Sequence, residues 1–251
     1  MSFIQARGLR KSFGRHKVLD GVDLDIQEQS SLVIIGRSGT GKSVLIKTLI
    51  GIIKPDGGRV KINGIDFYDA TKDEKKGIVD NLGFLFQGGA IFDSLNVEDN
   101  ITFSVNREQY LTPEQKSDLA VENLEAVGLS SQVLKLMPSE LSGGMLKRVA
   151  LARAICGKPK IIMFDEPTTG LDPIMSNVIN DLIMQIRKNL KATTITISHD
   201  MNSVRQIATD VIMLDEGKIV WQGTAKEMEN TDEEHVDQFI HGKLEGPMSL
   251  I

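Results

Sequence analysis

The chain has 251 residues, of which 41% are hydrophobic and 25% are charged, and its formal net charge is −5. These values are typical of a globular protein that is large enough to bury a substantial core. The charge is not concentrated in a basic stretch, so we expect no nucleic-acid partner. No apolar run reaches the ~18 residues that cross a bilayer. The first five residues lack the basic and apolar regions of a signal peptide, so we expect a cytoplasmic protein.

A single cysteine, Cys156, is present. One thiol cannot form an internal disulfide, which fits a reducing compartment. Because it follows an apolar helical pattern over 149–155, burial is the expected role, with redox reactivity as the alternative.

The first part of the chain indicates short strands. Residues 22–26 alternate apolar and polar side chains, and residues 59–62 repeat this period of two before an Asn63-Gly64 turn. Residues 31–35 form a compact apolar run that ends at Gly36, which is typical of a strand buried on both faces of a parallel sheet.

Two later runs, 160–164 and 193–197, have the same compact apolar character. A helix-like segment follows each run. The one after residue 170 has a wide apolar face formed by Ile174, Met175, Val178, Ile179, Leu182, Ile183 and Ile186. Alternation of strands and helices predicts an α/β fold.

A helix-rich stretch over about residues 92–157 predicts a helical subdomain inserted into this α/β core. Within it, Thr112, Pro113 and Gln115 have the spacing of a capping box with proline at the first helical position. The apolar residues that follow lie broadly on one helical face: Leu119, Val121, Leu124 and Val127.

Near the end of the chain, residues 210–215 and 218–222 flank an Asp-Glu-Gly turn and predict a hairpin. The patterns at 224–227 and 231–234 each have threonine followed three residues later by glutamate. We therefore expect two capping boxes that open two short tail helices.

Residues 36–43 match G-x-x-x-x-G-K-[ST] without a mismatch, between a buried strand and a helical segment. In such a loop, backbone N–H groups and the helix N-terminus bind phosphate oxygens. Lys42 would neutralise the β- and γ-phosphates, and the Ser43 hydroxyl would ligate Mg²⁺. The loop alone does not distinguish kinases, GTPases and transport ATPases. The expected nucleotide contacts are Gly36, Arg37, Ser38, Gly39, Thr40, Gly41, Lys42, Ser43 and Val44.

Asp165 and Glu166 end the apolar run of 161–164. Carboxylates at the C-terminal end of a buried strand occupy the position where α/β proteins bind their ligands. Asp165 suits Mg²⁺, and Glu166 suits a general base for the attacking water. The alternative is an Asp-Glu-Pro sequence that merely ends a strand.

Leu141-Ser142-Gly143-Gly144-Met145 precedes a long helix. The order of the phosphate loop, Gln87, Ser-Gly-Gly, Asp-Glu-Pro and His199 resembles the ATP-binding cassette (ABC) family along nearly the whole chain. This resemblance implies a P-loop NTPase core with an antiparallel β subdomain and an inserted helical subdomain. It implies one nucleotide-binding domain over 1–251, with a short helical tail over about 224–251.

The resemblance also assigns roles by position. Phe13 would stack on adenine, with a core phenylalanine as the alternative. Gln87 would sense Mg²⁺ and water, and His199 would contact the γ-phosphate, so both join Lys42 and Glu166 as catalytic candidates. Asp172 would belong to the loop that follows the Asp165-Glu166 motif.

Ser142, Gly143 and Gly144 look like the signature that binds ATP held by a second copy of the chain. The expected assembly is therefore a homodimer that closes on two ATP molecules with Mg²⁺. One departure is Met145, which replaces the glutamine usual in the family and leaves any contact of that side chain in question.

Met145, the segment 86–97 and the tail 239–247 make the chain similar to the ATPases of Mla phospholipid transporters. This similarity implies an integral membrane permease and a periplasmic lipid-binding protein of the MCE type as partners. Phospholipid would move between the inner and outer membranes. The ATPase would then lie on the cytoplasmic side of the inner membrane, held there by the permease.

Three other functions stay open at this point. One is a soluble ABC ATPase for iron–sulfur cluster assembly, another is the ATPase of an importer or exporter for a different substrate, and the third is a binding module that does not hydrolyse ATP. Glu166 and His199 argue against the third. A DNA-repair cassette would need a long insertion that the sequence lacks.

Two apolar segments also have two interpretations. Ile91, Phe92 and Leu95 would either dock a permease loop or pack in the core. The tail residues Val236, Phe239 and Ile240, with the apolar end at 248–251, would either pack on the second copy or remain disordered.

Overall fold

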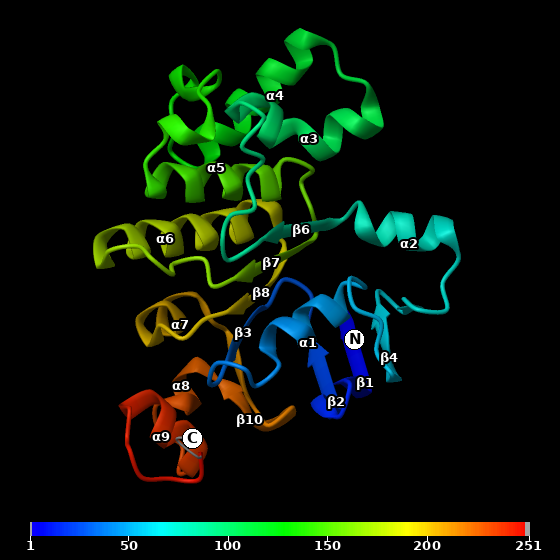
Figure 1. The fold of residues 1–251 in the computed structure, drawn as a ribbon, viewed down its shortest axis with the longest axis vertical. Coiled ribbons are helices and arrows are strands. Elements are labelled where there is room, and N and C mark those ends of the chain that lie inside the picture. The colour runs from blue at the N-terminus through cyan, green and yellow to red at the C-terminus, as the bar shows by residue number, and fades with distance from the viewer. Residues whose placement is uncertain (1, 249–251) are drawn as a thin grey trace. The chain divides into compact units, whose positions relative to one another are not determined.

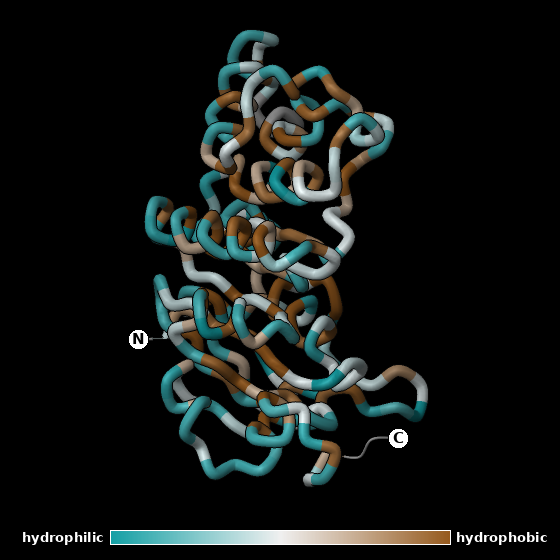
Figure 2. The backbone as a smooth tube through the Cα atoms, turned by 90° about the vertical axis from the view of Figure 1, so that its left-hand side faces the viewer, coloured by the Kyte–Doolittle hydropathy of each residue, from teal (hydrophilic) through white to brown (hydrophobic). Residues whose placement is uncertain are grey.

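The computed structural model describes residues 2–248, without the side chains of residues 106–109. The chain divides into two compact units, which are described separately. The first comprises Met1–Val79 and Thr193–Ile251, and the second comprises Asp80–Ala192. Figure 1 labels most elements of both units, and Figure 2 shows hydrophobic residues on inner stretches of the backbone and hydrophilic residues on many outer turns. Among the described residues, no helix is both long and apolar enough to span a membrane.

The first unit contains an antiparallel sheet with the order β2-β1-β4-β5. Ile4 of β1 pairs with Ile26 of β2 on one side and with Ile62 of β4 on the other. The buried residues of β2 alternate along its C-terminal half, as the sequence predicts for a half-buried strand. The strands are β1 (Ile4–Phe13), β2 (His16–Ile26), β4 (Gly57–Ile62) and β5 (Ile65–Asp66).

The same unit contains strands in the order β10-β9-β3-β8. β3 pairs in parallel with β8 and with β9, whereas β10 runs antiparallel to β9. Every residue of β3 and β8 is buried, which confirms the two predicted core strands. The elements are β3 (Ser31–Ile35), β8 (Thr193–Ile197), β9 (Asp210–Asp215), β10 (Lys218–Thr224), α1 (Lys42–Leu49), α2 (Lys72–Val79) and α7 (Met201–Ile207).

Two short helices follow β10: α8 (Ala225–Met228) and α9 (Glu234–His241). Thr224 and Glu227 form the predicted capping box at α8. The predicted box at 231–234 is wrong, because α9 begins at Glu234 and its N-cap residue is Glu233. The Thr231 hydroxyl accepts a hydrogen bond from Glu233 N instead, over 3.2 Å.

The segment after α9 folds back on its own helix. The buried Gln238 side chain accepts from Met248 N (2.8 Å) and donates to Met248 O (3.3 Å). Val236 and Met248 are also buried within the chain. The predicted contact of this tail with a second copy stays a prediction, and residues 249–251 of its apolar end lie outside the described residues.

The second unit contains the parallel pair β6 (Leu82–Leu85) and β7 (Ile161–Asp165). Between these strands the chain is helical, as predicted for residues 92–157. In Figure 1, α3 and α4 lie together beside α5, and all three helices contact one another. The helices between the strands are α3 (Val97–Gln109), α4 (Pro113–Ala126) and α5 (Gly143–Ile155), with short 3₁₀ turns at Ser131–Val133 and Pro138–Glu140, and α6 (Pro173–Leu190) follows β7.

The sequence predictions for the helices of this unit hold in part: on α4, Leu124 and the C-cap residue Val127 are buried, whereas Leu119 and Val121 are half-buried. The Thr112 capping box with Gln115 is present at α4. On α6 the buried residues are Ile179, Leu182, Ile183 and Ile186, together with Asn180. Ile174, however, is 76% exposed, so the predicted apolar face is wrong at its first residue. The apolar pattern of α6 extends to the first turn of the helix, but burial of its side chains does not.

Candidate nucleotide site

The glycine-rich loop lies between β3 and α1 in the first unit. Lys42 opens α1, is only 8% exposed, and donates to the carbonyl oxygens of Gly36 (2.7 Å) and Arg37 (2.6 Å). The Thr40 hydroxyl also donates to Arg37 O, over 2.9 Å. Ser38 and Gly39 form the exposed tip. The loop backbone therefore surrounds the Lys42 ammonium group. A loop of this shape, which leads into a helix N-terminus, is suited to bind phosphate.

Gly41 is the N-cap residue of α1, with a φ of +103°. A Cβ at this position would lie 2.6 Å from the carbonyl oxygen of Val18 in β2. The glycine is thus required by the close approach of a strand as well as by the shape of the loop. The sequence motif contains no sign of this second reason.

Phe13 lies at the end of β1 with 52% of its surface exposed. The alternative interpretation as a core residue is therefore wrong. The Lys11 ammonium lies 5.4 Å from the centroid of the ring. An exposed aromatic face beside a cation is suited to stack on a flat ligand.

His199 is exposed and lies between the end of β8 and the start of α7. Since β8 is the parallel neighbour of β3, His199 and the glycine-rich loop leave the sheet at the same edge. The next residue, Asp200, caps α7 by accepting from Asn202 N (3.0 Å) and from the Ser203 hydroxyl (2.7 Å). This cap fixes the backbone on which His199 sits.

In the second unit, Asp165 and Glu166 stand at the end of β7. Glu166 has a φ of +50°, a left-handed conformation that costs a non-glycine residue about 1 kcal/mol. Its Oε2 accepts from the Thr169 hydroxyl (2.8 Å) and from the Gln87 amide (3.2 Å). The structure thus brings together two predicted residues, Gln87 and Glu166, which are 79 positions apart.

Thr169 is a residue that sequence reasoning missed. Its only signal is its place three residues after Glu166, on the turn that leaves β7. Because its hydroxyl and the Gln87 amide donate to the same oxygen, the Glu166 carboxylate is held in one orientation.

Ser142 and Asp172 each begin a helix of the second unit. The Ser142 hydroxyl accepts from Met145 N (3.3 Å) at the start of α5. Asp172 Oδ1 accepts from Ile174 N and Met175 N (2.9 Å each) at the start of α6. Both predicted site residues therefore have a structural role as N-caps in this chain.

The glycines of the signature differ in their surroundings. Gly143 is exposed, and no heavy atom lies within 4 Å of where its Cβ would be. A Cβ at Gly144 would lie 3.0 Å from the Met175 Cε. A cavity of about 590 Å³ in the same unit is lined by residues that include Gln87, Gly143, Lys147 and Thr169.

Mg²⁺ prefers oxygen ligands and keeps several waters or phosphate oxygens in its shell. The predicted ligands fit this preference, because Ser43 offers a hydroxyl, Asp165 a carboxylate and Gln87 an amide oxygen. Over the part of the chain that the structure describes, no group of three or more His, Cys, Asp and Glu side chains is arranged to hold a metal.

Residues 19–169, more than half of the chain, match the family model of the ABC transporter. The chain belongs to the ABC transporter family. Accordingly, this ABC ATPase hydrolyses ATP, with Mg²⁺ as the metal. ABC cassettes, the family of this subunit, form dimers and work with a membrane permease.

Two relatives match nearly the whole length of this chain. The ABC ATPase is 38% identical over 247 residues to a probable ribonucleotide transport ATP-binding protein, mkl, of Mycobacterium leprae, with 98% of this chain and 71% of that protein covered. It is 35% identical over 247 residues to the intermembrane phospholipid transport system ATP-binding protein MlaF of Haemophilus influenzae, with 98% and 93% covered.

Among solved structures, the ABC ATPase is similar to the cassette MJ0796, a dimer in a post-hydrolysis state bound to ADP and phosphate. The TM-score is 0.81 at 28% identity, over 88% of this chain and 98% of that one. The similarity confirms the predicted P-loop ABC ATPase fold.

Proposed function

We propose that this ABC ATPase energises phospholipid transport by a separate membrane permease, between the inner and outer membranes. The observation that carries the proposal is the similarity to MlaF at 35% identity over nearly the full length of both chains. Similarity to mkl, whose name gives a different substrate, makes the ATPase of another transporter the competing function.

For hydrolysis, we assign the phosphates to the loop at 36–44 and to Lys42, and adenine to Phe13. Ser43, Asp165 and Gln87 would hold Mg²⁺, which would supply positive charge at the β- and γ-phosphates. Glu166 would take the proton of the attacking water, since Thr169 and Gln87 already hold its carboxylate in place. His199 would contact the γ-phosphate.

The signature residues 142–144, with Asp172, would face ATP bound to a second copy of the chain. The start of α5 supports this assignment because its backbone N–H groups and its dipole favour an anion. ATP binding would then close the dimer and hydrolysis would open it, which gives the permease two states to follow. In this proposal residues 1–251 form one nucleotide-binding domain, with the helical subdomain at about 92–157 and the tail at about 224–251.

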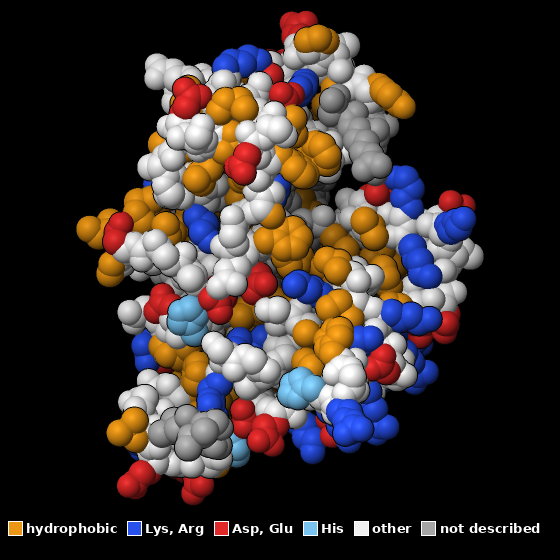
Figure 3. Space-filling view, in the orientation of Figure 1, with side chains coloured by type: hydrophobic (Ala, Val, Ile, Leu, Met, Phe, Trp, Pro, Cys, Tyr) orange, Lys and Arg blue, Asp and Glu red, His pale blue; other side chains and the backbone are white. Residues whose placement is uncertain are grey.

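The segment 91–95 is the proposed docking site for the permease. Phe92 is 42% exposed and lies 4.6 Å, centroid to centroid, from Phe103, which is equally exposed. Figure 3 shows hydrophobic side chains exposed over the helical part of the second unit. Ile91 and Leu95 are half-buried, so Phe92 is the most exposed apolar side chain of the segment.

The side chain of the fully buried Asn100 holds the backbone of this docking loop through hydrogen bonds. Its oxygen accepts from Phe92 N (2.9 Å), and its amide donates to the carbonyls of Phe92 (3.1 Å), Leu95 (2.9 Å) and Asn96 (3.0 Å). These four hydrogen bonds restrain the loop in the absence of the partner, which would lower the entropic cost of docking.

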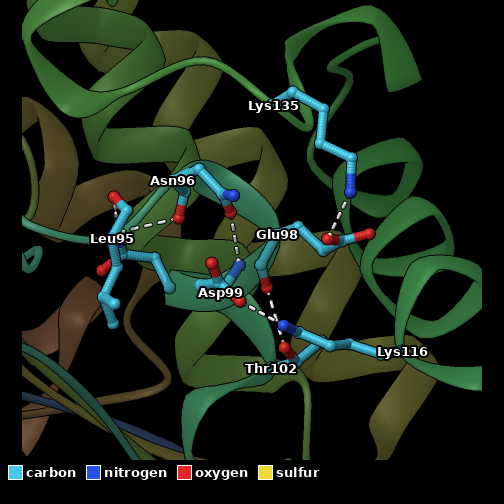
Figure 4. Close-up of polar contacts among 8 residues, drawn as sticks. Leu95, Asn96, Glu98, Asp99, Thr102, Lys116 and Lys135 are labelled. Atoms are coloured by element: carbon cyan, nitrogen blue, oxygen red, sulfur yellow. Dashed lines mark hydrogen bonds and ion pairs between the residues drawn. The ribbon is translucent and has the colours of Figure 1, made fainter. Parts of the chain in front are cut away.

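Ion pairs hold the start of α3, the helix that follows the loop in the chain (Figure 4). Lys135 pairs with the buried Glu98 at 2.5 Å, and Lys116 pairs with Asp99. The Asn96 side chain accepts from Asp99 N (2.8 Å), so the loop passes directly into an anchored helix.

Affinity purification from solubilised membranes, with identification of bound proteins and lipids, tests the proposal. We expect a polytopic permease, a periplasmic lipid-binding protein of the MCE type and phospholipid, with the ATPase in the membrane fraction only when the permease is present. Recovery with soluble iron–sulfur assembly proteins and no membrane protein would contradict it. Recovery with a permease for another substrate would support the role as a transporter ATPase and show that the proposed substrate, phospholipid, is wrong.

A further inference from the structure

Helix α5 holds the backbone that follows β6 through two cationic side chains. Lys147 Nζ donates to the carbonyl oxygen of Gln87 over 2.5 Å. Arg153 donates to the carbonyl oxygens of Ala90 (2.7 Å) and Gly89 (2.8 Å). Three carbonyls within four residues are thus tied to the helix that begins at the signature.

The two cations differ in their surroundings. The Arg153 guanidinium lies 5.8 Å from the centroid of the Phe92 ring, at the docking loop, and burial lowers its pKa. Lys147 instead lines the cavity near Gln87, Gly143 and Thr169. Burial also lowers the pKa of Lys147, whereas the negative charges of Glu166 and Asp165 act in the opposite direction.

A half-buried ammonium group costs solvation free energy that a methionine or leucine of similar length would not. At Lys147 this cost is offset by one strong hydrogen bond and by the attraction of the two carboxylates at the end of β7. Filling space is therefore a poor explanation for a lysine at this position.

Gln87 is the link between the lysine and Glu166. Its main-chain carbonyl accepts from Lys147, and its side-chain amide donates to the Glu166 carboxylate. Lys147 lies four residues after Gly143 on a continuous helix, so a displacement of the helix start moves the ammonium group with it. Such a movement would change where the Gln87 amide points.

We propose that Lys147 is a positioning residue for ATP hydrolysis, which links the signature end of α5 to Gln87 and, through Gln87, to Glu166. The proposal rests on the roles proposed above for the signature, Gln87 and Glu166. A phosphate bound at Ser142 and Gly143 would thereby set the orientation of the carboxylate in the same chain. Lys147 itself touches neither nucleotide nor water in this mechanism.

The test compares steady-state ATPase activity of the permease complex with wild type, Lys147→Met, Lys147→Arg and Lys158→Met. Lys147→Met should lower kcat about tenfold or more and change the KM for ATP less than about twofold, because positioning is lost while the phosphate loop is intact. Lys147→Arg keeps a cationic donor and should recover kcat to within about threefold of wild type. Lys158 pairs with Glu122 on the surface, and its variant should match wild type.

A double-mutant cycle with Gln87→Ala tests the route. If Lys147 acts through Gln87, adding Lys147→Met to Gln87→Ala should lower kcat no further than Gln87→Ala alone. Additive losses would overturn the proposal, as would a Lys147→Met kcat within about twofold of wild type, or a Lys147→Arg variant as slow as Lys147→Met.

Two further measurements keep the outcomes separable. Glu166→Gln is assayed in parallel: if it retains the wild-type rate, the proposed site itself is wrong. If Glu166→Gln is inactive but Lys147→Met is not impaired, only the inference about Lys147 fails. Should Lys147→Met not fold, as judged by thermal unfolding, Lys147→Gln replaces it and must meet the same criteria.

Discussion

Gly36 lies so close to Leu214 that a Cβ on the glycine would be 2.2 Å from the Leu214 carbonyl oxygen. The two residues come from the neighbouring parallel strands β3 and β9, where β3 passes into the phosphate loop. Gly36 also has a φ of +138°, which L side chains rarely adopt. The first glycine of the motif is therefore needed to build the sheet edge before any phosphate binds.

Gly36→Ala should destabilise the fold by about 2–5 kcal/mol, because backbone overlap adds to conformational strain. Gly39→Ala is the matched control: its φ is +84°, but nothing lies within 4 Å of the added Cβ. It should cost only about 1 kcal/mol. Urea unfolding without nucleotide measures both, and equal losses would show that the Leu214 contact does not matter.

Glu166→Gln should retain ATP binding and lose most turnover, about 10²–10⁴-fold, because an amide cannot take a proton from water. Thr169→Val should cost less, since Gln87 still holds the carboxylate. Single-turnover phosphate release, alongside equilibrium binding of ATP, separates the two effects. A Glu166→Gln rate equal to wild type would show that another group is the base.

Asn100→Ala should lower the free energy of unfolding by about 2–4 kcal/mol, because backbone groups of the docking loop lose their buried partners. Asn123 is similarly buried, but among the described residues its amide donates only to Leu119 O. Asn123→Ala should therefore cost only about 1 kcal/mol. Asn100→Ala, unlike Asn123→Ala, should also weaken recovery of the permease.

The Cys156 thiol is only 3% exposed, and burial raises its pKa to about 12. A thiol-reactive probe at pH 8 should therefore modify the folded protein only at the rate of unfolding, and should react rapidly in guanidinium chloride. The contribution of the protonated thiol to stability is present below its ordinary pKa and is lost as the pH rises toward 12. Fast native-state labelling at pH 8 would contradict this burial.

Thr224 and Thr231 precede the two tail helices but have different roles. Thr224→Ala removes a complete capping box and should cost about 1 kcal/mol. Thr231→Ala removes one hydrogen bond outside the helix and should cost about 0.5 kcal/mol or less. Thermal unfolding of the two variants, measured side by side, checks the order.

Several features followed from the sequence because they depend on neighbouring residues. The period-two pattern located the half-buried strands, and compact apolar runs located β3, β7 and β8. The phosphate loop and the capping boxes at Thr112 and Thr224 are likewise short-range arrangements, so their spacing was sufficient. The box expected at Thr231 failed because α9 begins at Glu234, so Thr231 lies outside the helix and its hydroxyl accepts from Glu233 N instead.

Other features were decided by the tertiary structure alone. The sheet order places Gly36 against Leu214, 178 positions away, and the β6–β7 pair places Gln87 beside Glu166. Thr169, Asn100 and Lys147 acquire their roles only from what packs around them. Contacts between distant segments depend on how strands pair, and a single sequence records only the local preferences of each strand.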